Sequence, residues 1–130
     1  MLRNWLNKGF TFKENMEYTM KFVNRSYLIV KPRQPYIDWV RSFDDSVEID
    51  DLIIQKTIYL VDEPEFDSPE EINNIIKKVC RDIFVSELEA WYTDKESFPK
   101  DMTYKAFKQW FDVEYVDLGF DLSEYELIAE

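Results

Sequence analysis

Acidic side chains are the most abundant groups in this chain that could do chemistry. The sequence holds 27 aspartates and glutamates, and several stand close together. The clusters are Asp44/Asp45, Asp50/Asp51, Asp62/Glu63/Glu65/Asp67 and Glu87/Glu89. Paired carboxylates can bind Mg²⁺ or Ca²⁺, or can divide into an acid and a base for proton transfer. The run at residues 62–67 lacks the spacing and the central glycine of an EF-hand loop, so a solvent-exposed acidic loop is the favoured interpretation.

Other catalytic chemistries need residues that the chain lacks or spaces differently. The sequence contains no histidine, which excludes Ser-His-Asp and Cys-His machinery and histidine-ligated zinc. The glycines, Gly9 and Gly119, lie too far apart to form a phosphate-binding loop. The single cysteine, Cys80, falls within an apolar helical stripe, where a buried structural thiol is the usual finding. We therefore expect no metal and no cofactor, and the sequence favours a protein that is not an enzyme.

Cations beside aromatic residues form a second candidate site, within residues 22–39. The candidate ligand- or partner-binding residues are Arg25, Lys31, Arg33, Tyr36 and Trp39. Guanidinium groups suit carboxylates or phosphates, and aromatic rings can stack on a base or on an arginine. Strand alternation would place Arg25 and Lys31 on one face. The structural alternative is an edge strand that its cations protect from pairing with other chains.

Charge is divided unevenly along the chain. Residues 1–41 carry eight cations and three acids, whereas residues 42–130 carry eight cations and 24 acids, giving the chain its net charge of −11. The favoured interpretation is that the basic third lies against the acidic remainder of the same chain. An acidic body repels nucleic acid, whose binding depends on neutralised phosphates. We expect another protein as the partner, with a homodimer as an alternative, and neither nucleic acid nor membrane.

Length and composition describe one small folded domain. Among the 130 residues, 45% are hydrophobic and 17% aromatic, and disordered chains are poor in aromatic residues. Two glycines are too few for the many tight turns of a β-sandwich or barrel. A lone cysteine, with no secretory signal and no run long enough to span a membrane, favours a cytoplasmic protein. We interpret residues 1–19 as an N-terminal extension and residues 20–130 as a single domain.

Strands and short helices are predicted for the first half of that domain. Residues 21–30 are rich in β-branched and aromatic side chains, which favours a strand, and Pro32 and Pro35 follow it. Helices are predicted at residues 35–42 and 49–55, a second strand at 57–61 and a turn at 62–67.

A long helix is the clearest prediction of the second half. Ser68-Pro69-Glu70-Glu71 has the pattern of a capping box, and an apolar stripe at helical spacing continues to residue 91. A helix at 104–111 capped by Thr103, a strand at 113–118 and a candidate helical turn in the tail 121–130 follow. This order predicts an α+β domain, with a small, mainly antiparallel sheet of about three strands packed by one long helix and several shorter helices.

Scattered strand, proline and aromatic residues also carry a family resemblance. They are Asn24-Arg25, Val30-Lys31-Pro32, Gln34-Pro35, Asp38-Trp39, Thr57-Ile58-Tyr59-Leu60, Trp91-Tyr92, Phe98-Pro99 and Phe107/Trp110/Phe111. From about Met20 to Asp112 the chain resembles a family of small bacterial proteins of unknown function. The resemblance implies a bacterial, cytosolic, single-domain protein, and it transfers no activity and no binding residue.

A non-catalytic binding or regulatory module is the function that these features favour. Such a module would show scattered acids and an apolar or aromatic patch. An acidic mimic of nucleic acid, or an immunity-type inhibitor of a basic protein, would instead show a regular surface row of carboxylates. A divalent-metal enzyme, the least favoured alternative, would need a pocket with three or more convergent acids.

Overall fold

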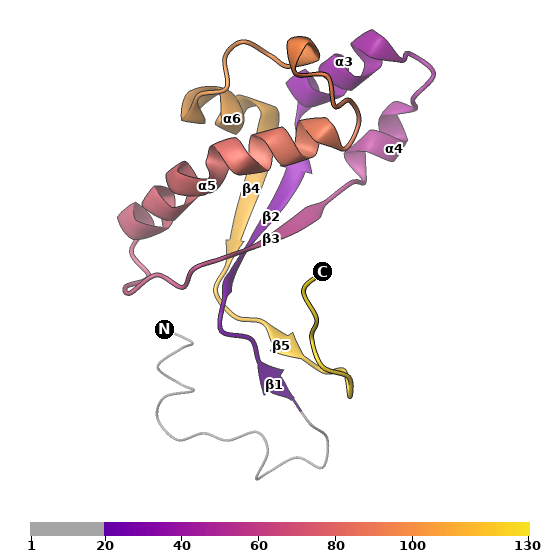
Figure 1. Cartoon of the computed structure of the whole chain (residues 1–130). Coiled ribbons are helices and arrows are strands. Elements are labelled where there is room, and N and C mark those ends of the chain that lie inside the picture. The colour runs from indigo at the N-terminus through magenta and orange to yellow at the C-terminus, as the bar shows by residue number, and fades with distance from the viewer. Residues whose placement is uncertain (1–19) are drawn as a thin grey trace.

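The computed structural model describes residues 20–130, so the predicted extension at residues 1–19 lies outside the described residues. The elements are β1 (Lys21–Phe22), β2 (Ser26–Pro32), α3 (Gln34–Phe43), α4 (Ile49–Ile53), β3 (Thr57–Val61), α5 (Pro69–Glu89), the 3-10 turn η1 (Lys95–Ser97), α6 (Tyr104–Trp110), β4 (Phe111–Val116) and β5 (Phe120–Asp121). The chain is an α+β protein, as predicted, with its long helix α5 lying across the larger of two antiparallel sheets (Figure 1).

The main sheet has the strand order β3-β2-β4, with β2 antiparallel to both neighbours. The structural alternative of a protected edge strand is therefore wrong for residues 26–32. A central position suits this segment, because its apolar run buries Leu28 and Val30 completely. The same alternation leaves Tyr27, Ile29 and Lys31 half-buried on the opposite face of the sheet.

The hydrophobic core fills the space between the sheet and the helices α3, α5 and α6. Three fully buried phenylalanines form its centre, Phe84 from α5, Phe107 from α6 and Phe111 from β4. Their ring centroids lie 5.4 to 6.1 Å apart, and the rings of Phe84 and Phe111 are perpendicular. Such edge-to-face contacts add to the stabilisation that burial alone provides.

The start of α5 follows the predicted cap, although the capping box is only half formed. Ser68 Oγ accepts a hydrogen bond from the backbone nitrogen of Glu71 at 3.2 Å. The Glu71 carboxylate does not return to Ser68, but accepts from the backbone nitrogens of Glu65 and Phe66 at 2.7 and 2.8 Å. The carboxylate thus closes the preceding acidic loop onto the helix.

Substitution of Ser68 tests whether its side chain caps α5. Ser68→Ala should lower the free energy of unfolding by about 1 kcal/mol, because the Glu71 nitrogen loses its acceptor. Urea denaturation measures the change, with Ser46→Ala as a control from a loop where the hydroxyl caps no helix. Identical midpoints for Ser68→Ala and the unmodified protein would contradict the assigned cap.

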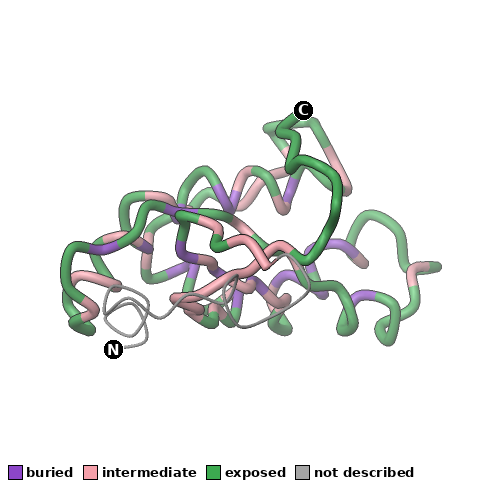
Figure 2. Tube along the Cα trace, turned by 90° about the horizontal axis from the view of Figure 1, so that it is seen from below, coloured by how far each residue is buried: buried purple, intermediate pink, exposed green. Residues whose placement is uncertain are grey.

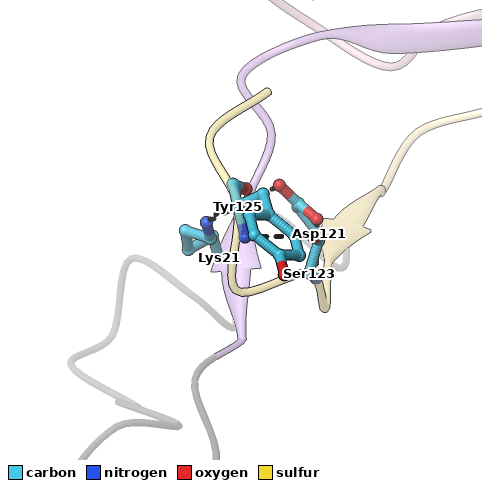
Figure 3. Close-up of polar contacts among 4 residues, drawn as sticks. All are labelled: Lys21, Asp121, Ser123 and Tyr125. Atoms are coloured by element: carbon cyan, nitrogen blue, oxygen red, sulfur yellow. Dashed lines mark hydrogen bonds and ion pairs between the residues drawn. The ribbon is translucent and has the colours of Figure 1, made fainter. Parts of the chain in front are cut away.

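A short ribbon of two strands extends from the main sheet (Figure 1). The predicted strand at 21–30 is interrupted at residues 23–25, and its first part, β1, pairs with β5 through Lys21–Asp121 and Phe22–Phe120. The tail forms no helical turn, because Asp121 instead caps a turn by accepting from the Ser123 nitrogen at 2.9 Å (Figure 3). Lys21 Nζ lies 3.7 Å from Asp121 Oδ2, which links the two strands.

Packing at the base of the ribbon requires glycine at residue 119. A Cβ at this position would overlap the ring of Tyr27. Beyond β5, residues 122–130 are exposed to the end of the chain (Figure 2). Within residues 20–130, no helix has both the length and the apolar character that crossing a membrane requires.

Candidate functional site

The predicted cations on β2 and just after it contact carboxylates of the same chain. Lys31 Nζ lies 3.7 Å from Glu114 Oε2, and Arg33 Nη2 lies 3.5 Å from Asp112 Oδ1. Both acids belong to β4, so the sheet register brings the charges together. Arg25 is exposed and donates to the backbone carbonyl of Asn24 at 2.8 Å. Pairs this exposed contribute at most about 1 kcal/mol each to stability.

The predicted aromatic residues lie in the core. Tyr36 and Trp39, on α3, are 3% and 9% exposed. The Tyr36 hydroxyl donates to the Glu87 carbonyl at 2.6 Å, and Trp39 Nε1 donates to the Ser97 carbonyl at 2.8 Å. Burial raises the pKa of Tyr36, and the negative charge of Glu87 raises it further. These two side chains attach α3 to the rest of the fold, and the structure does not gather the five predicted residues into one site.

The acidic clusters do not converge either. Among residues 20–130, no group of three or more acidic or cysteine side chains is arranged to hold a metal ion. Glu87 and Glu89 separate, since Glu89 is exposed whereas Glu87 is half-buried between α5 and β3. The Glu87 carboxylate accepts from Tyr59 Oη at 3.0 Å and from Thr57 Oγ1 at 3.2 Å. Desolvation raises the pKa of Glu87, and the two hydroxyl donors oppose that rise.

The raised pKa of Glu87 predicts a specific pH dependence. The stability that comes from the protonated carboxyl is complete below the ordinary pKa, and it is lost as pH rises through the raised pKa. Glu87→Gln keeps an oxygen acceptor and cannot ionise. The free energy of unfolding of Glu87→Gln, relative to that of the unmodified protein, should therefore increase as pH rises from acidic to neutral. The increase should be at most about 1 kcal/mol because the site is half-exposed.

Urea denaturation at one acidic and one neutral pH measures the Glu87→Gln effect. Glu89→Gln is the matched control, since it removes the same charge from an exposed position two residues away. If Glu87→Gln instead gained stability relative to the unmodified protein on acidification, the direction of the pKa shift would be contradicted.

The lone cysteine has the environment of a structural thiol. Cys80 is buried, and its Sγ donates to the Lys77 carbonyl at 3.3 Å. Desolvation is the largest influence on the thiol and raises its pKa, which reduces the reactive thiolate at neutral pH.

The sheet carries an apolar surface that sequence analysis did not identify. On β3, Thr57, Tyr59 and Val61 point toward α5, so Ile58 and Leu60 point to the other side. Ile58 is 58% exposed and Leu60 is 52% exposed. Ile58 pairs with the half-buried Ile29 of β2. We call Ile29, Ile58, Leu60 and the half-buried Val116 of β4 the open face.

Charged groups border the open face. The Lys31–Glu114 ion pair lies on the same side of the sheet, beyond Ile29. Asp62 and Glu63 are exposed where β3 ends. An apolar centre with a polar rim is the composition of surfaces that bind other proteins. The sequence carried a signal for this surface in the run Thr57–Val61. There, residues 58 and 60 are as apolar as the residues that point toward α5.

Comparison with known proteins identified no relative of this chain. No family model matches the chain, and neither the curated proteins nor the solved structures gave a match.

Proposed function

We propose that the protein is a non-catalytic cytoplasmic binding module that holds another protein against the open face. The observation that carries this proposal is the pair Ile58 and Leu60, each more than half exposed in the middle of a regular strand. The helices α5 and α6 pack on the opposite side of the sheet (Figure 1). Covering the remaining exposed area of these two side chains would contribute about 1 to 2 kcal/mol each to binding.

Charge identifies the kind of partner. Residues 1–19 contain three of the chain's 16 cations and two of its 27 acids, so residues 20–130 hold 13 cations and 25 acids. The partner surface that would complement the open face is an apolar strip. Lysines or arginines should surround that strip, because charges opposite to those of the acidic residues 20–130 speed association and exclude wrong partners. A second copy is a poorer occupant, since two whole chains of net charge −11 repel each other.

The ion pairs of β4 favour this function over an acidic mimic of nucleic acid. Asp112 and Glu114 would be natural members of a surface row of carboxylates, and each is paired with a cation of the same chain. A binding module was expected to show an apolar patch, and the open face has that character.

Affinity capture with matched variants tests the proposal. The baits are the unmodified full chain, Ile58→Asp/Leu60→Asp, and the control Ile53→Asp/Phe66→Asp, whose positions are 53% and 68% exposed on α4 and in the loop before α5. Both double variants add the same charge. We expect one basic protein to be recovered with the unmodified chain and with the control, and to be lost with Ile58→Asp/Leu60→Asp.

Other results would overturn the proposed occupant. Equal recovery by the two double variants would place the partner elsewhere. A dimer in sedimentation experiments that Ile58→Asp/Leu60→Asp dissociates would identify a second copy. Stronger binding of a hydrophobic dye by full-chain Trp5→Ala/Phe10→Ala would identify the chain's own residues 1–19 as the cover.

A further inference from the structure

Residues of α5, α6 and the start of β4 line a hollow of about 220 Å³, and none of them belongs to the open face. Buried apolar side chains, among them Ile76 and Phe107, form part of its wall. Polar side chains also line it, namely Arg33, Asn73, Tyr104, Lys108 and Asp112. A concave site with an apolar wall and a few convergent polar groups is the usual form of a small-molecule site.

Two lysines meet at one aromatic ring beside this hollow. Lys108 Nζ lies 4.6 Å from the centroid of the Tyr104 ring, and Lys77 Nζ lies 5.5 Å from the same centroid. Lys77 comes from α5 and Lys108 from α6, two helices in contact with each other (Figure 1). The ring attracts both ammonium groups, yet it brings no negative charge to offset their mutual repulsion.

Among residues 20–130, these two lysines form no ion pair, although Asp112 lines the same hollow as Lys108. The ion pairs described within residues 20–130 join Lys21, Lys31 and Arg33 to acids, and none involves Lys77 or Lys108. Arg33 also faces the hollow, and its pair with Asp112 at 3.5 Å is half-exposed. A pair this exposed is weak, and a guanidinium has five donors, so Arg33 retains donors for an anion. Two cations, Arg33 and Lys108, and one acid, Asp112, therefore line the hollow, and Lys77 adds a third cation beside it at the Tyr104 ring.

We propose that this hollow binds a small phosphate-bearing molecule. Arginine presents a planar fork that matches phosphate oxygens, and lysine supplies a compact point charge, so the two residue types together suit a phosphate group. Asn73 adds an amide donor at the edge. The volume is large enough to admit a phosphate group with a short extension. This site is separate from the open face and does not depend on the proposed protein partner.

A neighbouring hollow provides a matched control. Its charged lining consists of Arg81, Lys95 and Lys100 with one acid, Glu89. Within residues 20–130 its lysines make no cation–π contact, and its volume is larger, at about 430 Å³. Removing Lys77 and Lys108, or Lys95 and Lys100, changes the net charge equally, which separates specific binding from general attraction.

Titration of the ¹⁵N-labelled full chain with inorganic phosphate and with pyrophosphate, at constant ionic strength, tests the site. We expect at least one of these anions to shift the amide signals of Asn73, Lys108 and Asp112 in a saturable manner. Lys77→Gln/Lys108→Gln should weaken that binding at least about tenfold, since each lost charge-assisted contact is worth about this factor or more. Lys95→Gln/Lys100→Gln should leave the affinity within about twofold.

Three results would overturn the phosphate site. The first is the absence of saturable shifts with either anion. The second is an equal loss of affinity in the two double variants, which would indicate attraction by the overall charge. The third is a set of shifts centred on Arg81, Lys95 and Lys100, which would place the anion in the neighbouring hollow. Circular dichroism of each variant confirms that these exposed substitutions leave the fold intact.

Discussion

Replacement of Phe84 by alanine should lower the free energy of unfolding by about 3 to 5 kcal/mol. Phe84 is fully buried, and its ring contacts those of Phe107, Trp110 and Phe111 with centroids 5.4 to 6.1 Å away. Truncation would therefore leave a cavity at the junction of α5, α6 and β4. Because small domains are stable by only about 5 to 15 kcal/mol, this change would remove a large part of the total.

Urea denaturation measures the Phe84→Ala effect, and Phe84→Leu is the graded control. Leucine fills part of the cavity, so its loss should be clearly smaller. Phe66→Ala, at an exposed phenylalanine, should change stability by less than about 0.5 kcal/mol. A loss below about 1 kcal/mol for Phe84→Ala would contradict the core described here, since that value is far below the usual range for a buried phenylalanine.

Ile58→Asp/Leu60→Asp should weaken binding of the partner at least about 100-fold while leaving the fold intact. Each substitution removes an apolar contact and would place a carboxylate in a desolvated interface. Both positions are more than half exposed in the free protein, so the fold should survive a loss of about 1 to 3 kcal/mol from their buried area and from the low strand preference of aspartate.

Calorimetric titration of the purified pair measures this affinity. Ile53→Asp/Phe66→Asp, with the same added charge, should bind within about threefold of the unmodified protein, since a remote charge pair is largely screened at physiological salt. Equal weakening by both double variants would mean that charge, and not the open face, determines binding.

Local signals in the sequence predicted much of the fold. The strand Thr57–Val61 and the helix beginning at Pro69 occur as expected, because a bounded apolar run and a Ser-Pro cap act over a few residues. The pairing of β1 with β5 could not be predicted, because it joins Lys21 to Asp121 across nearly the whole domain. No local pattern near either residue indicates that partner.

The candidate sites depend more strongly on tertiary structure. Position in the sequence suggested that Arg33 and Tyr36 belong to one patch, whereas helix α3 turns Tyr36 into the core and leaves Arg33 at the surface. The lysines at Tyr104 come from different helices, so their meeting follows from the packing of α5 on α6. The apolar residues of β3 were visible in the sequence, but their exposure depends on which face the helices cover.

Methyl cross-saturation from the bound partner identifies which side chains of the protein the partner contacts. With methyl-labelled protein in complex with its unlabelled, protonated partner, the transfer reports which side chains touch the partner. We expect strong saturation at Ile29, Ile58 and Leu60 and little at Ile53, which is exposed on α4. Saturation centred on Ile53, or on residues of the C-terminal tail such as Leu127, with none at Ile58 and Leu60, would contradict the open face as the binding surface.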